Sequence, residues 1–266
     1  MSSDFLLHSS WLNYCVKFTV LGSGTLIPVP DRGNSGYFLQ SGNTGILIDG
    51  GSGALRKMAD FDLDYLDIDG ICYSHLHPDH TFDLIPLLFA LKHDPRAEKR
   101  SVLKITAPIG FKHYFKSLMD IYEEWVMPED LDVEIEEISR GSSSIDNISF
   151  QCGHTEHTEQ SITYRFSDGD GGDLFYSGDT DYCEELLSSA SEVDLMILEC
   201  SFPDDDKRPG HLTPMECGKI AAKTECGRLV LTHFYPHIIG TDIISSVEKH
   251  FDGPVDLAYD GMELQI

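Results

Sequence analysis

Six consecutive residues, His75-Leu76-His77-Pro78-Asp79-His80, place three imidazoles and one carboxylate between an expected strand and an expected helix. On an extended backbone, His75 and His77 lie two residues apart, so their side chains lean to the same side. Asp79 and His80, in the turn that follows, can face a second point nearby. Imidazole and carboxylate ligands suit Zn²⁺ best, with Mn²⁺ and Fe²⁺ as alternatives. The segment therefore predicts a metal site.

A centre with two metal ions needs more side chains than this one segment supplies. Two ions need about six or seven ligands and a bridging group. Three further residues stand at the expected ends of strands farther along the chain: His157, Asp179 and His233. Each alone is a common polar residue at a strand end. Together, and in this order behind the histidine segment, they complete the ligand set of a dinuclear centre.

Strands and helices in alternation must position these side chains. Apolar runs and alternating patterns predict strands, and apolar residues at helical spacing predict helices. The expected strands cover residues 16–21, 36–40, 45–49, 70–74, 102–107, 133–138, 148–152, 162–166, 174–177, 195–199 and 229–232, and the expected helices 53–59, 82–92 and 111–124. This alternation predicts an α/β layered domain.

A further helix is marked by its ends. Thr213 is the expected N-cap, Pro214 occupies the first helical position, Glu216 completes a capping box, and Gly227 closes the helix. Short stretches rich in Gly, Ser and Asp predict loops, and none is long enough to separate two domains. These stretches are 141–144, 167–173 and 203–210. Residues 1–266 are therefore expected to form one domain.

The order of the candidate ligands resembles that of the metallo-β-lactamase superfamily. The pattern His75-x-His77-x-Asp79-His80, followed by His157, Asp179 and His233, carries the resemblance, and Asp49 in Leu47-Ile48-Asp49-Gly50-Gly51 matches the family's early structural Asp. The resemblance extends from Phe18 to about Asp260. It implies a four-layer αββα sandwich with the metals at one edge of the two sheets.

Further segments are similar to ribonuclease Z and its arylsulfatase-like relatives. They are Leu21-Gly22-Ser23-Gly24-Thr25, Pro28-x-Pro30-x-Arg32-Gly33-Asn34-Ser35, His157-Thr158-x-x-Ser161-x-x-Tyr164-Arg165 and Gly210-His211-Leu212-Thr213-Pro214. In ribonuclease Z, the last segment carries a histidine implicated in protonating the leaving group. Two departures are plain. The chain has no room for the tRNA-gripping arm between Phe166 and Tyr176, and Asp49-Gly50-Gly51-Ser52-Gly53 replaces the family's Asp-Cys-Gly-Glu-Gly.

The resemblance implies a role for each site residue. His75, His77 and His157 would bind one zinc ion, Asp79, His80 and His233 the other, and Asp179 would bridge them. A hydroxide between the ions would be the nucleophile, and Asp79 would also orient it. His211 would be the general acid. Its place before a helix N-terminus, where free N–H groups favour an anion, supports this role. His154 is the alternative third ligand, but the offset to Tyr164-Arg165 favours His157. His237 is expected at the mouth of the site.

Composition limits the partners. The chain has 19 Lys and Arg against 45 Asp and Glu, a formal net charge of −26, so it lacks the basic footprint of a nucleic-acid binder. A stripe formed by Arg96, Lys99, Arg100, Lys104 and Lys112 is the one candidate substitute for the missing arm. No apolar run nears 18 residues and no signal peptide or Cys-x-x-Cys pair is present, so we expect a cytoplasmic protein with reduced thiols and no membrane contact.

These observations favour a dinuclear zinc phosphodiesterase for a small or nucleotide-like diester. A ribonuclease Z-type tRNA 3′-processing endonuclease is the first alternative. Hydrolysis of another ester (a sulfate ester, thioester or lactone) is the second, because a fold does not fix a function. A metal-binding sensor without catalysis is a third. The loops at 94–100 and 203–210 are expected to border the pocket, and the resemblance implies a homodimer.

Overall fold

Apolar strands buried on both faces account for the centre of the molecule. The computed structural model describes residues 16–97, 101–167, 169 and 172–266. In β3 (Thr44–Ile48), Ile46 and Ile48 pack between the two sheets, whereas Leu47 packs against the helices on the outer face. Because alternate strand residues point to opposite faces, both faces of β3 are buried. The short apolar run in the sequence is therefore the mark of an internal strand.

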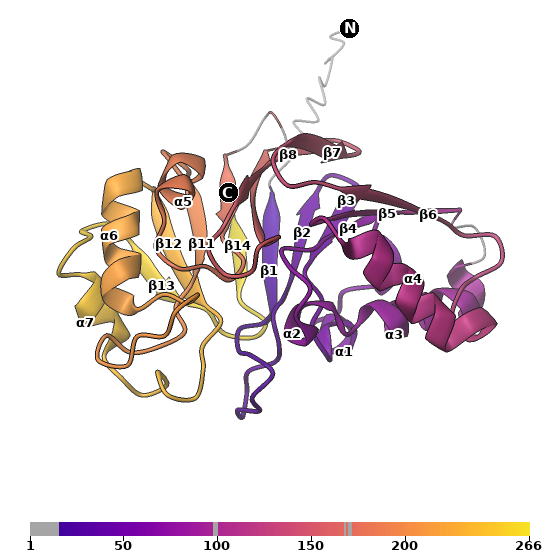
Figure 1. The fold of residues 1–266 in the computed structure, drawn as a ribbon, viewed down its shortest axis with the longest axis horizontal. Helices are drawn as coiled ribbons and strands as arrows, with labels where there is room; N and C mark the ends of the chain where they lie inside the picture. The colour runs from indigo at the N-terminus through magenta and orange to yellow at the C-terminus, as the bar shows by residue number, and fades with distance from the viewer. Residues whose placement is uncertain (1–15, 98–100, 168, 170–171) are drawn as a thin grey trace, which may run out of the picture.

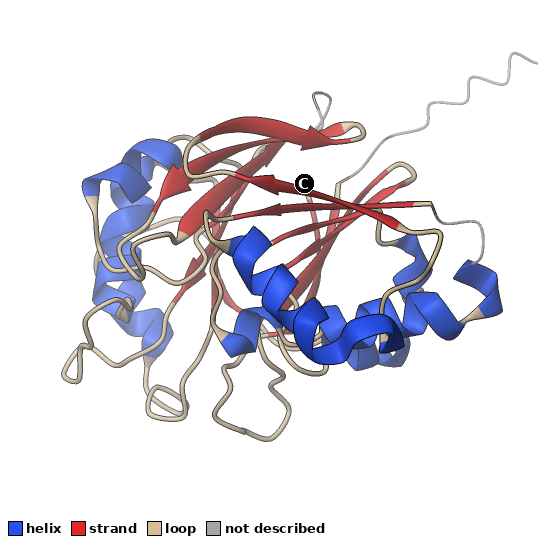
Figure 2. Ribbon diagram, turned by 45° about the vertical axis from the view of Figure 1, so that its right-hand side comes forward, coloured by secondary structure: helices blue, strands red, loops and turns tan. Residues whose placement is uncertain are grey.

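Two seven-stranded mixed sheets lie face to face, with helices on the outer side of each (Figures 1 and 2). The first sheet has the order β14 (Glu263–Gln265), β1 (Lys17–Gly22), β2 (Gly36–Ser41), β3, β4 (Gly70–Cys72), β5 (Val102–Ala107) and β6 (Asp132–Glu137). The second has the order β13 (Val255–Leu257), β12 (Arg228–Thr232), β11 (Leu195–Glu199), β10 (Leu174–Tyr176), β9 (Ile162–Ser167), β8 (Ile148–His154) and β7 (Gly141–Ile145). The expected four-layer αββα sandwich is confirmed.

The helices divide between the two outer faces (Figure 1). The first sheet is covered by α1 (Ala54–Asp60), α2 (Pro78–Thr81), α3 (Leu84–His93) and α4 (Phe111–Tyr122), and the second by α5 (Glu184–Ser189), α6 (Pro214–Thr224) and α7 (Ile243–Val247). Three short 3₁₀ turns cover Tyr65–Asp67, Pro95–Ala97 and Glu123–Trp125. Among the described helices, none is long and apolar enough to cross a membrane.

Parallel strands bring the candidate site to one edge. In the first sheet β3, β4, β5 and β6 are parallel neighbours, and in the second β10, β11, β12 and β13 are. The carboxyl ends of neighbouring parallel strands meet at the same edge of a sheet, where α/β proteins place their ligands. The histidine segment follows β4, Asp179 follows β10 and His233 follows β12. Strand order thus brings together residues far apart in the sequence.

Two sequence predictions about local structure were wrong. The stretch 141–144, expected as a loop, forms β7, which pairs with β8 through a two-residue turn at Asp146 and Asn147. The serines of β7 show no apolar pattern in the sequence, since backbone hydrogen bonds hold this edge strand. Asp146 supplies the positive φ, 50°, that the two-residue turn needs. Helix α6 ends at Thr224, with Glu225 rather than Gly227 in the left-handed conformation. Gly227 lies instead against Asp194, where an added Cβ would be 2.8 Å from the backbone oxygen.

Other boundaries moved by a few residues, and several short elements were missed. The expected helix at 82–92 is preceded by the separate α2, and the helix from Phe111 stops at Tyr122 because Glu123 takes a φ of 49°. The sequence did not predict α5, α7, β13 or β14, because elements of six residues or fewer are too short to show a periodic pattern. The six cysteines that the structure describes are free, as expected.

Candidate metal centre

The seven predicted ligands converge at this edge. His75 and His77 lie in the segment after β4, Asp79 and His80 in α2, His157 between β8 and β9, Asp179 after β10 and His233 after β12. Their ligand atoms form two groups, His75 with His77, His157 and Asp179, and Asp79 with His80 and His233, in each of which all atoms lie within 4.8 Å of one another. Both groups are ones that could hold a metal ion.

The first group has the spacing of ligands around one ion. His77 Nδ1 lies 3.1 Å from His75 Nε2 and 3.0 Å from His157 Nε2. The Asp179 Oδ2 atom lies 3.7 Å from both His75 Nε2 and His157 Nε2. Ligands at about 2.0–2.1 Å from a tetrahedral zinc ion are about 3.3 Å apart. The donor set therefore fits one divalent cation.

Asp179 also faces the second group, with its other oxygen. Asp179 Oδ1 lies 3.4 Å from His80 Nε2 and 3.4 Å from His233 Nε2. His233 Nε2 in turn lies 3.5 Å from Asp79 Oδ2. One carboxylate thus presents its two oxygens to two separate sets of imidazoles. This is the position that a bridging ligand occupies.

Unpartnered polar atoms test whether a cation fits here. Among the described residues, His80 Nε2, Asp179 Oδ1 and His233 Nε2 are buried and have no hydrogen-bond partner. A buried polar atom without a partner costs about 1–3 kcal/mol. Three such atoms that face one another are satisfied together by a cation between them. The residues present fit the metal ion that the sequence predicts.

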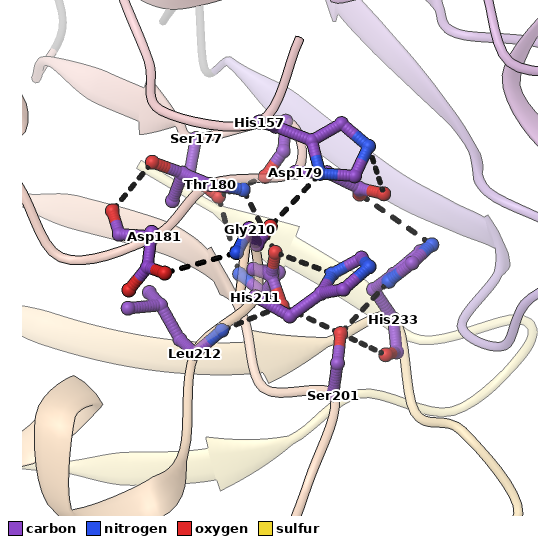
Figure 3. Close-up of polar contacts among 12 residues, drawn as sticks. His157, Ser177, Asp179, Thr180, Asp181, Ser201, Gly210, His211, Leu212 and His233 are labelled. Atoms are coloured by element: carbon purple, nitrogen blue, oxygen red, sulfur yellow. Dashed lines mark hydrogen bonds and ion pairs between the residues drawn. The ribbon is translucent and has the colours of Figure 1, made fainter. Parts of the chain in front are cut away.

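Hydrogen bonds on the far side of three rings, those of His157, His233 and His80, fix which nitrogen faces the centre. His157 Nδ1 donates to the Gly210 carbonyl at 2.8 Å, as Figure 3 shows. His233 Nδ1 donates to Ser201 Oγ at 3.0 Å. His80 Nδ1 lies 2.7 Å from Asp49 Oδ2. Each bond leaves Nε2 free for a metal ion, and such partners orient a ligand and raise its basicity.

The charges around the centre favour a cation. Burial disfavours the charged form of His80, yet Asp179 and Asp49 raise its pKa well above the usual value. Burial alone would raise the pKa of Asp79, but His233 and His80 lower it to about 2. Burial, and then the neighbouring His80, lower the pKa of His75 well below its usual value. Asp79 is thus ionised and His75 is neutral, as a metal ligand must be, whereas His80 has to release its proton when a metal ion binds.

His211 forms a third such group with Asp179 and His233, whose ligand atoms all lie within 4.8 Å of one another. Its ring centroid lies 4.9 Å from that of His157 and 5.8 Å from that of His233, to which it is stacked. Its Nδ1 lies 3.0 Å from Glu199 Oε1. Burial would lower the pKa of His211, but Glu199 and the site carboxylates raise it to about 9. Glu199 thus favours the protonated form of an imidazole that lies next to the candidate metal centre.

Glu199 was not predicted as a site residue. It ends the otherwise apolar β11 and is buried. Its carboxylate also accepts hydrogen bonds from the Thr180 amide at 2.7 Å, the Ser201 hydroxyl at 2.5 Å and the Leu212 amide at 3.1 Å. A single carboxylate at the end of an apolar strand was the available signal. Through Ser201 and Thr180, Glu199 connects His211 to the segments that carry His233 and Asp179.

The helix N-terminus next to His211 does not offer the free N–H groups that were expected. The capping box is present, with Thr213 accepting from the Glu216 amide and Glu216 accepting from the Thr213 amide. The Met215 amide donates to Asp204, and Pro214 has no N–H. The first-turn donors of α6 are therefore occupied, so this part of the argument for anion binding was wrong. The position of His211 does not depend on it.

The remaining candidates, His154 and His237, belong to none of these groups. His154 ends β8, and His237 is exposed, its ring 6.3 Å from that of Phe202. Of the two expected bordering loops, 203–210 reaches His157 through Gly210, whereas the described part of 94–100 bonds to Tyr65 and Asp64. His8, Lys99 and Arg100 lie outside the described residues.

Comparison with known proteins agrees with this geometry. The family model described as the beta-lactamase superfamily domain matches residues 44–234, more than half of the chain. The chain therefore belongs to the beta-lactamase superfamily. Uncharacterized protein Rv1339 of Mycobacterium tuberculosis is 31% identical over 90% of this chain and 88% of its own length.

Two further relatives carry names that state an activity. Probable metallo-hydrolase YhfI of Bacillus subtilis is 27% identical over 92% of this chain and 98% of its own. Its crystal structure matches with a TM-score of 0.83, covering 95% of this chain and all of that one. Ribonuclease Z of Nocardia farcinica is 24% identical over 92% of this chain and 95% of its own. The chain is accordingly a metal-dependent hydrolase, as the sequence predicted.

Proposed function

We propose that this chain is a dinuclear zinc-dependent phosphodiesterase that acts on a small or nucleotide-like diester. The observation that carries the proposal is Asp179, whose two oxygens face two separate histidine groups at 3.4 and 3.7 Å. His75, His77 and His157 would hold one ion, Asp79, His80 and His233 the other. Mn²⁺ and Fe²⁺ are the alternative metals. Bound ions would supply a Lewis acid and a hydroxide nucleophile at neutral pH.

The chain's own residues supply the proton chemistry. We assign His211 as the general acid, because Glu199 favours its protonated form and its ring is stacked on that of His233. Glu199 holds His211 Nδ1, so the opposite nitrogen, Nε2, is the one that delivers the proton to the leaving oxygen. Asp79, ionised next to His233, would orient the nucleophile. A positioned acid of this kind contributes about 10²–10⁴-fold to a rate.

A tRNA 3′-processing endonuclease is the second candidate, because ribonuclease Z is among the relatives. Three features favour a smaller substrate. The net charge is −26, only residues 168–173 separate β9 from β10, and two cations of the proposed basic stripe are paired, Arg96 with Asp94 and Asp64, and Lys104 with Asp146. Affinity for RNA rests largely on free cations that neutralise phosphates.

A direct comparison of substrates tests the proposal. Zinc-loaded protein is given bis(p-nitrophenyl) phosphate and, separately, a tRNA precursor with a 3′ trailer, with the Asp179→Asn variant as the matched control. We expect wild type to hydrolyse the diester, the variant to lose this activity, and the tRNA to stay intact. Cleavage of the tRNA at the discriminator would overturn the preference for small substrates. Hydrolysis of aryl sulfates, thioesters or lactones without any diester turnover would overturn the phosphodiesterase assignment.

A further inference from the structure

An apolar loop tip projects from the same edge of the molecule as the metal centre. Residues 26–30, between β1 and β2, read Leu-Ile-Pro-Val-Pro, and we call them the apolar tip. The Leu26 and Ile27 side chains are 44% and 46% exposed. Figure 1 shows the segment that carries the tip reaching beyond α1 and α2 at the lower edge of the molecule. Five adjacent apolar residues on a projecting loop are unusual on a surface with this many charges.

Hydrogen bonds fix the base of this loop. Asp260 accepts hydrogen bonds from the Ser23 amide at 3.0 Å, the Ser23 hydroxyl at 2.9 Å and the Gly33 amide at 2.6 Å. Arg32 donates to Ser23 Oγ and to the Ala258 carbonyl at 2.7 and 2.8 Å. Bonds at its base restrict the freedom of this loop, which lowers the entropic cost of binding.

Two contacts place the loop next to the Asp79–His80–His233 half of the centre. The Phe234 amide, directly after His233, donates to the Ser23 carbonyl at 3.0 Å. A Cβ added at Gly51 would lie 2.0 Å from the Asp79 carbonyl oxygen and 2.5 Å from the Asn34 Cβ, so the far end of the loop passes beside Asp79. The loop thus begins beside one predicted ligand and ends beside another.

Neighbouring segments carry further exposed apolar side chains. Phe82, which follows α2 and its ligands, is 50% exposed, and Ile239, in the segment after His233, is 41% exposed. Apolar surface that surrounds a polar reaction centre binds an apolar part of a ligand, because water leaves both surfaces. In the proposed phosphodiesterase the polar centre would take the phosphoryl group, which leaves the apolar residues for a substituent.

We propose that the apolar tip binds a hydrocarbon substituent of the diester substrate, so that the preferred substrate is a phosphodiester with an alkyl or acyl chain. This rests on the proposed phosphodiesterase function. Five residues are too few for a stable protein partner, since such interfaces bury about 800 Å² on each side. A net charge of −26 opposes contact with an anionic membrane. A small amphiphilic molecule is the occupant that satisfies both limits.

Alkyl p-nitrophenyl phosphodiesters test the inference, because the leaving group stays the same while the substituent grows from methyl to hexyl. We expect wild-type kcat/KM to rise with chain length. The Leu26→Ser/Ile27→Ser variant should lower the hexyl-to-methyl ratio by about tenfold, as two exposed apolar contacts are removed. Ile121→Ser/Trp125→Ser removes two other exposed apolar side chains, near the C-terminal end of α4, and should leave the ratio unchanged.

Binding gives a second readout that does not depend on turnover. Calorimetry should show tighter binding of hexyl phosphate than of methyl phosphate by wild type, and a smaller difference for the Leu26→Ser/Ile27→Ser variant. Equal kcat/KM values for methyl and hexyl diesters, or an unchanged ratio in this variant, would overturn the inference alone. No hydrolysis of any diester by zinc-loaded wild type would instead overturn the proposed function. Wild-type binding to phosphatidylcholine vesicles that the variant loses, at an unchanged ratio, would assign the tip to a membrane and overturn the inference.

Discussion

Asp49 and Asp179 are two buried carboxylates that face the same imidazole, His80. The described part of the protein supplies hydrogen-bond partners for both oxygens of Asp49 but not for both oxygens of Asp179. Asp49 accepts hydrogen bonds from the Ser74 amide and hydroxyl, each at 2.8 Å, from the Tyr176 hydroxyl at 2.6 Å and from His80 Nδ1 at 2.7 Å. Asp179 has an oxygen, Oδ1, without a hydrogen-bond partner among the described residues. The first carboxylate belongs to the folded framework. The second is built for a group that the chain does not itself contain.

The largest effect is expected from Asp179→Ala. Loss of the proposed bridging ligand should lower kcat for diester hydrolysis by about 10⁴-fold, because metal ions stabilise the transition state by several kcal/mol and each 1.36 kcal/mol is about tenfold. In a thermal unfolding assay, zinc at about 100 Kd should stabilise wild type by about 2.7 kcal/mol and the variant much less. An equal zinc-induced rise in Tm for both proteins would count against the bridging role.

His211→Ala should have the next largest effect, and one that depends on the leaving group. We expect kcat/KM to fall by about 10³-fold for a diester with an alkoxide leaving group, which needs a proton, and by far less for p-nitrophenolate, which does not. Glu199→Gln should show the same dependence more weakly, since Glu199 acts on the leaving group through His211 and not directly. Equal losses for both leaving groups, measured in one assay at fixed pH, would exclude the general-acid role.

The sequence could predict those site residues that a short segment or a strand end marks. The ligands His75 to His80 form one segment, and His157, Asp179 and His233 lie at strand ends, so the sequence alone pointed to all seven. Their supports join distant residues: Tyr176 to Asp49 and His211 to Glu199. Neither pair has a spacing that marks it, because packing of the two sheets brings Tyr176 to Asp49, and the loop after β11 brings His211 back to Glu199.

Conformational details escaped prediction for a related reason. Asp49 and His233 take φ values of 51° and 59°, in a region that costs a side-chain-bearing residue about 1–3 kcal/mol. No sequence pattern identifies the two, since the strain persists only where surrounding contacts hold it. The same applies to the α6 N-terminus, where Asp204, eleven residues from Met215, occupies a donor that the capping signal alone would leave free.

Asp49→Ala should reduce stability whether or not metal is present. It leaves the donors of Ser74, Tyr176 and His80 buried without a partner, and removal of one member of a buried charged pair costs about 3–5 kcal/mol. Zinc affinity should also fall about 10–100-fold, because His80 loses its orienting partner. Denaturant unfolding with and without chelator checks this. A loss of stability seen only in the presence of zinc would make Asp49 a part of the metal centre rather than of the framework.

Asp204 is a surface carboxylate, and its substitution is expected to change the free energy of unfolding least. It accepts hydrogen bonds from the Met215 amide at 2.8 Å and from the Ser246 hydroxyl, tying the segment after β11 to α6 and α7. Burial would raise the pKa of Asp204, but these bonds lower it below the usual value. Its folded pKa therefore lies below its unfolded pKa, so the charged form stabilises the fold above an unfolded value of about 3.9, and this contribution is lost as pH falls.

Asp204→Asn should thus lower the free energy of unfolding at pH 7 by less than about 1 kcal/mol, since solvent screens a largely exposed group. The difference from wild type should shrink as pH falls below about 4, where the wild-type carboxylate begins to take up its proton. Urea unfolding at pH 7 and at pH 3 measures both values. A difference that grows at low pH would mean that the charge of Asp204 opposes folding. The order of the expected effects, from Asp179 through Asp49 to Asp204, would then no longer follow from how many hydrogen-bond partners the protein gives each carboxylate.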